Sequence, residues 1–171
     1  MKKMLSLAVV TVILLLTGAG AVFADATVIS VKGTAACSMG EKWVPLEVGS
    51  KIKDGSKIST GVKSTVVLKL ANSTVTVQPL SMMKIYEDRI AQDSSDTRIA
   101  LRRGALKAEV SRMHEVKTVF KVATPVATSS VRGTIQSVAA SPYGTAFAAS
   151  DGSIFVESKK GDVRTISGRL Q

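Results

Sequence analysis

The stretch Thr65-Val66-Val67-Leu68-Lys69-Leu70 decides the fold class, because large hydrophobic side chains recur in it at every second position. Val66, Leu68 and Leu70 fall on one side of an extended chain, while the residues between them fall on the other side. A period of two residues is typical of a half-buried β-strand and not of an amphipathic helix. The segment 105–110 repeats the pattern, which predicts one buried face and one solvated face for each strand.

Short segments rich in Val, Ile and Thr recur along the rest of the chain, and turn formers such as Asp54-Gly55 and Asp151-Gly152 separate many of them. No comparable helical period is present. The sequence therefore predicts an all-β fold, a single domain of many short strands arranged as a β-solenoid or a twisted sandwich. We expect strands at 27–32, 65–70, 74–78, 82–86, 98–102, 105–110, 118–123, 134–138, 145–149, 153–157 and 163–166.

The N-terminus has the pattern of an export signal. Two lysines precede an uncharged apolar run, Met4–Thr17, and small residues lead from it to Ala24. We expect a signal-peptide helix at 1–24, cleaved after Ala24, and one β domain at 25–171 that is periplasmic or secreted. An uncleaved membrane anchor is the alternative, because the uncharged stretch is about long enough to cross a hydrocarbon core of roughly 30 Å.

Composition excludes several classes of protein. The 171 residues include 23 Lys+Arg against 13 Asp+Glu, one His and one Cys, so the chain cannot form an internal disulfide, a thiolate metal cage or a His-pair metal site. Aromatic residues make up 4%, which argues against stacking of bases or sugar rings on many exposed rings. Cys37 has three interpretations, namely a buried small apolar residue, an intermolecular disulfide or a reactive thiol, and we favour the first.

A family likeness appears in the order of several motifs. The runs Trp43-Val44-Pro45-Leu46, Lys53-Asp54-Gly55 and Ile58-Ser59-Thr60-Gly61 resemble the N-terminal half of the FecR-domain family, named for the ferric-citrate regulator. The later string 120–127, followed by Val131-Arg132-Gly133-Thr134, resembles that family's signature segment. The likeness covers most of residues 28–168. It implies an extracytoplasmic module that is β-rich, solenoid-like and used for partner recognition.

The sequence departs from the family pattern in two ways. Asn72-Ser73-Thr74 stands where the family often has an Asp-Gly-Ser turn, and Ile135 stands where an aromatic residue is common. In addition, only Met1 and two lysines precede the apolar run. We therefore expect a stand-alone module without the cytoplasmic anti-sigma segment of the transmembrane regulators, and the signalling mechanism of those regulators does not transfer whole.

The signature segment also has a physical interpretation. Pro125 lacks an amide hydrogen and pushes Thr124 toward extended geometry, so the pair marks a strand end, an edge or a bulge. Gly133 can adopt positive φ or allow close approach of the backbone. Arg132 presents a forked donor that either contacts an anion or partner, or joins two turns of the same chain. We interpret Thr124, Pro125, Arg132, Gly133 and Thr134 as mainly structural.

Positive charge is spread over the predicted strands instead of being gathered in a tail. Our candidate binding residues are Arg102, Arg103, Lys107 and Arg132. A basic surface of this kind would attract an acidic extracytoplasmic protein or an anionic glycan or lipid of the envelope, whereas solvated charge without a partner is the alternative. We do not expect nucleic acid, and we expect membrane contact only through an uncleaved signal segment or peripheral charge. The residues that form the expected patch are Lys69, Lys84, Arg98, Arg102, Arg103, Lys107, Arg112, Lys117 and Lys121.

Catalytic motifs are sparse. Ser81-Met82-Met83-Lys84 spells the Ser-x-x-Lys of penicillin-recognising enzymes, but on a strand Ser81 and Lys84 point to opposite faces. His114 has no evident triad partners, and the carboxylates of Glu87-Asp88 and 93–96 fit no calcium loop and are interpreted as solvated turns. We therefore expect no enzyme, no cofactor and no metal.

Three functions are compatible with these patterns. The preferred one is a non-enzymatic FecR-like recognition module acting in envelope signalling or in attachment to anionic envelope components. A structural envelope spacer with a nonspecific basic surface is the second. A small hydrolase that uses Ser81 and Lys84 is the third and the most remote.

Overall fold

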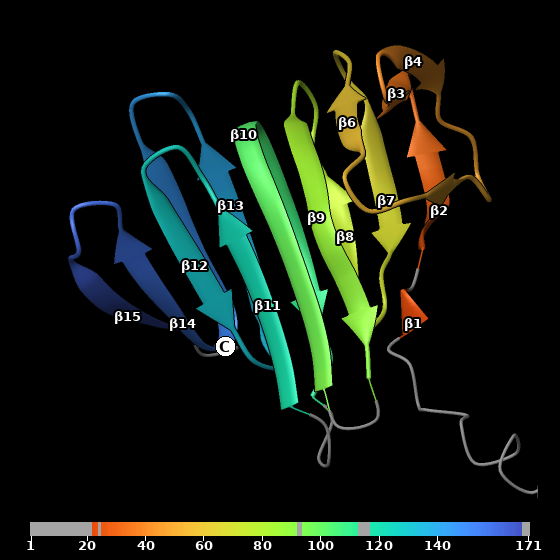
Figure 1. Cartoon of the computed structure of the whole chain (residues 1–171). Coiled ribbons are helices and arrows are strands. Elements are labelled where there is room, and N and C mark those ends of the chain that lie inside the picture. The colour runs from red at the N-terminus through yellow and green to blue at the C-terminus, as the bar shows by residue number, and fades with distance from the viewer. Residues whose placement is uncertain (1–21, 24, 92–93, 113–116, 169–171) are drawn as a thin grey trace, which may run out of the picture.

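The computed structural model describes residues 22–23, 25–91, 94–112 and 117–168, which form 15 strands and no helix (Figure 1). Within this part of the chain no helix is long and apolar enough to cross a membrane. Residues 1–21 and Ala24 lie outside the described residues, so the predicted signal-peptide helix and its cleavage site stay predictions. Of the segment 1–24, only the short strand at 22–23 is described. The strands are β1 (Val22–Phe23), β2 (Ala26–Lys32), β3 (Ala35–Met39), β4 (Lys42–Pro45), β5 (Lys51–Ile52), β6 (Lys57–Thr60), β7 (Thr65–Lys69), β8 (Ser73–Val77), β9 (Met82–Ile90), β10 (Ser94–Val110), β11 (Lys117–Ala123), β12 (Ala127–Val131), β13 (Ile135–Ala140), β14 (Thr145–Ser158) and β15 (Val163–Gly168).

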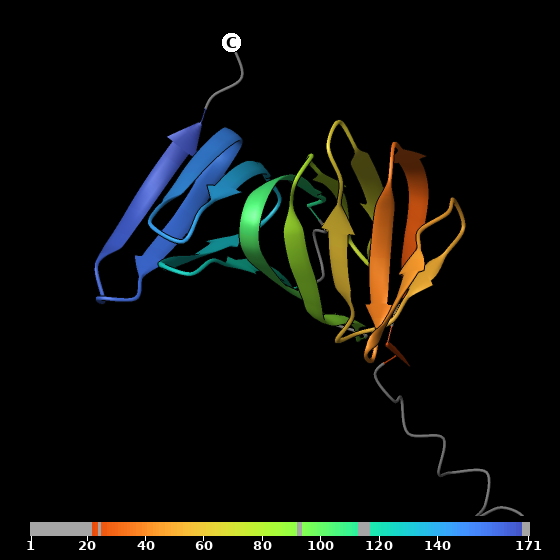
Figure 2. The same cartoon turned by 90° about the horizontal axis from the view of Figure 1, so that it is seen from above.

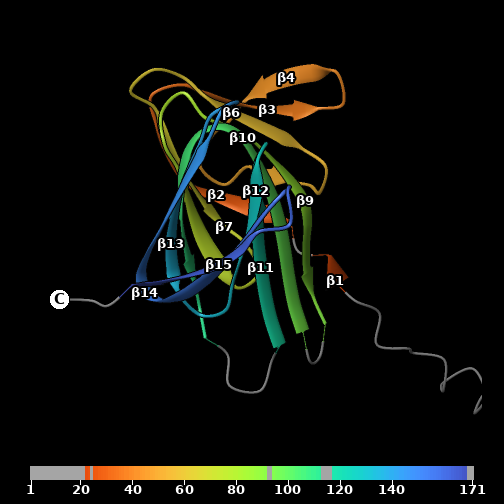
Figure 3. The ribbon, with the colours of Figure 1, turned by 90° about the vertical axis from the view of Figure 1, so that its left-hand side faces the viewer.

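The strands lie in two facing layers. The front layer has the order β4-β3-β6-β9-β10-β11-β12-β14-β15, with β1 added to the end of β9. The back layer has the order β5-β2-β7-β8-β10-β13-β14. Figure 3 shows β9 and β11 of the front layer on the opposite side of the molecule from β13 of the back layer. The all-β prediction is confirmed, and the layering is that of a twisted sandwich.

Two long strands connect the layers. The first half of β10 pairs with β9 and β11 in the front, and its second half pairs with β8 and β13 in the back. Likewise, β14 begins beside β13 in the back and ends between β12 and β15 in the front. Seen from above, the front and back strands enclose the interior (Figure 2). One continuous sheet therefore folds over itself to make the sandwich.

The strand predictions fail at these connections. The segments 98–102 and 105–110 were expected as separate strands but both belong to β10, and 145–149 and 153–157 both belong to β14. The glycines between them bend the strand without ending it. The patterns also do not predict β3, β4, β6 or β12, because these strands are short and carry few large hydrophobic side chains in alternation.

The bend in β10 depends on contact between Gly104 and Ser81. Gly104 has φ of 89°, in the left-handed region, and a Cβ atom there would overlap the backbone and side chain of Ser81. The fully buried Ser81 hydroxyl accepts a hydrogen bond from the Ala105 N–H at 2.9 Å and donates to the Ala105 carbonyl at 3.0 Å. The Ser81 N–H in turn donates to Thr60 Oγ1 at 3.0 Å. These contacts hold the corner where the chain leaves the front layer.

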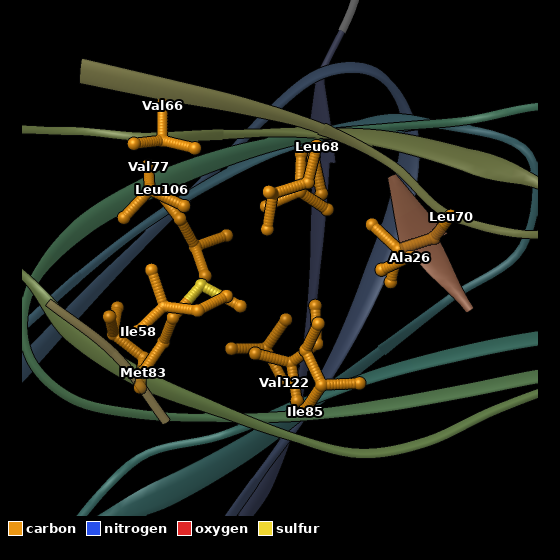
Figure 4. Packing of buried hydrophobic residues seen from close by; sticks show 14 of the residues in the cluster. Ala26, Ile58, Val66, Leu68, Leu70, Val77, Met83, Ile85, Leu106 and Val122 are labelled. Atoms are coloured by element: carbon orange, nitrogen blue, oxygen red, sulfur yellow. The ribbon is translucent and has the colours of Figure 1, made fainter. Parts of the chain in front are cut away.

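The core fills the space between the layers, as the alternation predicts. Val66, Leu68 and Leu106 of the back layer point toward Met83 and Ile85 of the front layer (Figure 4). Cys37 is also buried, and its burial raises the pKa of the thiol, in agreement with the interpretation of this residue as a small apolar core residue. The buried hydrophobic positions expected from the alternation at 65–70 and 105–110 are Val66, Leu68, Leu70, Leu106, Ala108 and Val110, and all are confirmed.

Gly104→Ala should destabilise the fold by at least about 3 kcal/mol, because a positive φ and a steric clash with Ser81 both oppose the new methyl group. Gly55→Ala is the matched control. Gly55 has φ of 85° but nothing within 4 Å of a Cβ atom, so only the backbone strain of about 1–2 kcal/mol should remain. Urea unfolding measures both variants. Equal losses of stability would show that the contact with Ser81 does not hold the corner.

Candidate functional site

The outer side of the front layer carries most of the exposed charge of the strands. Alternation with buried residues such as Ile58, Ile85, Ile99 and Phe120 turns the basic side chains outward. Among the described residues, these cations outnumber the acidic side chains of the same surface, which are Asp54, Glu87, Asp96 and Glu157. We call this surface the basic face and define it by Lys57, Lys84, Arg89, Arg98, Lys117, Lys121 and Arg132.

One half of the basic face is partly neutralised. Glu87 forms ion pairs with Arg89 at 2.9 Å and with Arg98 at 3.5 Å. These side chains line a hollow of about 600 Å³ that also includes Tyr86 and Lys121. Beside it, the ammonium group of Lys84 lies 4.4 Å from the centre of the Tyr86 ring, which is a cation–π contact.

The other half keeps its positive charge. A second hollow of about 350 Å³ lies over β11, β12 and β14, and we call it the cationic hollow. Lys117 and Arg132 supply its charge, Ser130 and Ser153 supply hydroxyls, and Phe155 supplies an exposed ring. Within the described residues, Lys117, Lys121 and Arg132 have no carboxylate within ion-pair distance. An anion could enter this hollow without first displacing a carboxylate of the described residues.

A bulge in β9 arranges the first half of the face. Ile85 pairs with Ile99 and Glu87 pairs with Arg98, so Tyr86 is an extra residue and both Tyr86 and Glu87 face outward. Asp88 consequently points inward and is fully buried. The prediction that Glu87-Asp88 is a solvated turn is therefore wrong, because both residues lie in β9 and Asp88 is buried. The sequence alone does not reveal the bulge, which decides the side on which each residue lies.

Asp88 ties the front layer to the turn between β7 and β8. Its carboxylate accepts hydrogen bonds from the Ala71 N–H at 2.8 Å and from the Thr97 hydroxyl at 2.9 Å, and its own N–H donates to Asp54 at 3.1 Å. Burial raises the pKa of Asp88, and desolvation is also the main cause of the raised pKa of Asp54. These buried contacts fix the part of β9 that presents Glu87 and Arg89.

The structure does not bring the predicted binding residues together. Arg102 and Arg103 are exposed where β10 bends, whereas Arg132 lies near the opposite end of the basic face, in the cationic hollow. Lys107 lies on the outer side of the back layer and forms an ion pair with Glu109 at 2.8 Å. Of the predicted candidates, only Arg132 belongs to the basic face.

Arg112, and not Arg132, joins two turns of the chain. Arg112 Nε donates to the Gly133 carbonyl at 2.8 Å, and a Cβ atom on Gly133 would overlap the Arg112 side chain. Gly133 has φ of 59°, as its predicted conformational freedom requires. Arg112 thus joins the two turns, and Arg132 is exposed to solvent.

The other signature residues hold turns. The Thr124 hydroxyl donates to the Ala127 carbonyl at 2.8 Å and accepts from the Ala127 N–H at 3.1 Å, across the turn that contains Pro125. Thr134 is buried, and its carbonyl accepts a hydrogen bond from the Val110 N–H at 3.0 Å. These contacts hold the turns in which Thr124, Pro125, Gly133 and Thr134 lie.

The Ser-x-x-Lys match has no catalytic geometry. Ser81 is fully buried and engaged at the β10 corner, whereas Lys84 lies on the outer face over Tyr86. His114 lies outside the described residues. Within the described residues, no group of three His, Cys, Asp or Glu side chains is placed to hold a metal ion.

Sequence reasoning missed several members of the face. Arg89 lies beyond the expected strand 82–86, because the pairing of β9 with β10 continues past the bulge to Ile90. The outward direction of Phe155, beside the face, could have been predicted because it alternates with the buried Ile154, although its neighbours could not. A third hollow, of about 510 Å³, lies farther along the front layer beside Trp43 and is mostly apolar.

The chain belongs to the FecR protein family, whose model matches residues 56–164. Two crystal structures of a "putative anti-sigma factor" from Parabacteroides distasonis share its fold, with TM-scores of 0.54 and 0.53 and 18% sequence identity. Each match covers 66% of this chain and 51% of the solved chain, so the protein spans about half the length of those structures. A comparison with curated proteins finds no match. The family prediction is confirmed.

Asp88→Asn should change how stability depends on pH. Because the folded-state pKa of Asp88 is raised above its ordinary value of 3.8, the folded protein binds more protons than the unfolded chain between the two pKa values. The free energy of unfolding of the wild type therefore falls as pH rises through this window. Asp88→Asn removes this titration, so its stability relative to wild type should rise with pH there.

Urea unfolding from about pH 3 to about pH 7 tests this expectation. A constant loss of about 1–3 kcal/mol should be superimposed, because the amide keeps only one of the two oxygens that accept from the Ala71 N–H and the Thr97 hydroxyl. Asp96→Asn, on the outer side of β10, controls for the removal of a negative charge. A stability difference between Asp88→Asn and wild type that is the same at every pH would contradict the assignment.

Proposed function

We propose that the protein is a non-enzymatic, extracytoplasmic recognition module of the FecR family that binds an anionic component of the cell envelope through its basic face. The observation that carries the proposal is the cationic hollow, where Lys117 and Arg132 stand beside an exposed aromatic ring without an internal counter-ion among the described residues. Membership of the FecR family supports a role in envelope signalling. The export signal predicted at residues 1–24 supports the location.

The electrostatics of the face favour capture of an anion. Arg98 and Lys121 are direct neighbours in the parallel pair β10–β11, and Glu87 is shared between two arginines. Neighbouring cations sum their potentials at short range, within a screening length of roughly 8 Å at physiological salt. Arginine also offers forked donors that match carboxylate and phosphate oxygens. A multivalent anion therefore suits this surface better than a neutral partner.

A structural spacer with nonspecific charge is the second candidate. The ion pairs of Glu87 with Arg89 and Arg98 favour it, because they show that part of the charge serves internal pairing on the surface. This candidate predicts that binding depends on total charge and not on where the charge lies. The two candidates can therefore be distinguished by making the same change in net charge once on the front layer and once on the back layer.

Charge reversal in the cationic hollow should abolish most of the binding. We expect Lys117→Glu/Arg132→Glu to weaken retention of the purified exported protein on its envelope fraction at least about tenfold, because two attractive contacts become repulsive. Lys32→Glu/Lys69→Glu is the matched control, since both lysines are exposed on the outer side of the back layer and the change in net charge is identical. The control should change binding by less than about twofold.

The measurement is co-sedimentation with peptidoglycan, with membrane vesicles and with immobilised anionic glycan, each over a salt series. Equal weakening by the two double variants would favour the spacer. Absence of retention on every fraction at low salt would reject recognition of an anionic envelope component.

A further inference from the structure

We propose that the basic face docks on anionic phospholipid headgroups at a bilayer surface, with lipid phosphates in the cationic hollow and the Phe155 ring in the interfacial region beside it. This inference rests on the proposed function and specifies its ligand. It follows from the side chains that share the face, from the arrangement of the hollow, and from the point at which the chain enters the fold.

Exposed aromatic residues and cations share one side of the molecule. Tyr86 is 56% exposed and Phe155 is 59% exposed, and both lie on the outer side of the front layer among the basic residues. Among the described residues, no aromatic side chain lies on the outer side of the back layer, where small residues and threonines such as Thr76, Ala139 and Ala148 predominate. Aromatic rings combined with Lys and Arg are typical of surfaces that lie at a membrane interface.

The register places the ring next to the charges. Phe155 pairs with Ser130 on β12, and Ser130 pairs with Lys121 on β11. Neighbouring strands are about 4.8 Å apart, so the ring and the ammonium stem project from strands about 10 Å apart. Lys117 and Arg132 line the cationic hollow together with Phe155. A phosphate held by these cations would leave the ring facing the region between headgroups and acyl chains.

The kind of cation favours lipid over protein. Of the residues that define the basic face, Lys57, Lys84, Lys117 and Lys121 are lysines. Lysine is depleted in protein–protein interfaces, whereas lysine near an anionic bilayer keeps its ammonium group at the headgroups and its aliphatic stem on apolar surface. An acidic protein remains the competing partner in the test below.

The chain enters the fold at the edge of the same face. Val22 of β1 pairs with Ile90 and Phe23 pairs with Arg89, so β1 joins β9 at the end that carries Arg89 (Figure 1). In the sequence, the residues from Met4 to Phe23 carry no charge. If the signal segment stays in the bilayer as the anchor alternative predicts, the Arg89 end of the basic face meets the membrane surface directly.

A tryptophan at position 155 tests the insertion. Trp43 is the only tryptophan, so Trp43→Phe/Phe155→Trp places the sole indole reporter in the proposed contact. We expect its emission to shift to shorter wavelength with vesicles of phosphatidylglycerol and phosphatidylcholine, but not with phosphatidylcholine alone. Trp43→Phe/Tyr143→Trp is the control, since Tyr143 is 96% exposed in the turn between β13 and β14 and should show no shift. Circular dichroism verifies the fold of each variant.

Binding affinity supplies the second readout. Lys117→Glu/Arg132→Glu should lower the affinity for the anionic vesicles at least about tenfold, while Lys32→Glu/Lys69→Glu should lower it less than about twofold. An unshifted indole at position 155, together with retained binding to soluble anionic glycan or to an acidic protein, would overturn membrane docking and leave the proposed function intact. Equal shifts at positions 143 and 155 would overturn the assigned face. Failure to bind vesicles, glycan and acidic protein alike would overturn both proposals.

Discussion

The close contact between Gly104 and Ser81 is the constraint on which the two-layered arrangement depends. A strand of 17 residues, β10, serves both layers only because it bends where a glycine can lie directly on a buried serine. The serine hydroxyl satisfies both backbone groups of Ala105, so the corner leaves no buried polar group of that residue unpaired. The front half of β10 then presents Arg98 outward, and the back half presents Lys107 on the opposite side of the molecule.

The basic face is a product of this folding and not of any local sequence cluster. Arg89, Arg98 and Lys121 come from three successive strands of the front layer, and Arg132 directly follows the next strand, β12. The parallel pairing of β10 with β11 brings Arg98 beside Lys121. The bulge in β9 adds Tyr86 and Glu87 to the same side while burying Asp88 below them. The hydrogen bonds of Asp88 hold this irregular segment, so the surface charges rest on a buried polar anchor.

The sequence predicts the core well because burial follows the two-residue period within each strand, as at Val66 and Leu68. It predicts the connections between the layers poorly, because a glycine with positive φ can either end a strand or bend it. At Gly104 the strand bends because of contact with Ser81, which is distant in the sequence. The same limit applies to the candidate site. Strand periodicity turns Lys117 and Lys121 outward, but only the register shows that Phe155 joins them, and that Arg112 instead of Arg132 binds the Gly133 carbonyl.

The placement of like charges on the basic face supports the proposal that this face binds an anion. Neighbouring cations such as Arg98 and Lys121 repel one another on adjacent strands, and a purely structural sheet would gain stability by replacing one of them. Glu87 relieves the repulsion only around Arg89 and Arg98, while within the described residues the cationic hollow contains no acidic group to relieve it at Lys117 and Arg132. In the proposed complex, a bound anion would supply the missing counter-charge, so the same residues that weaken the free sheet would strengthen the complex.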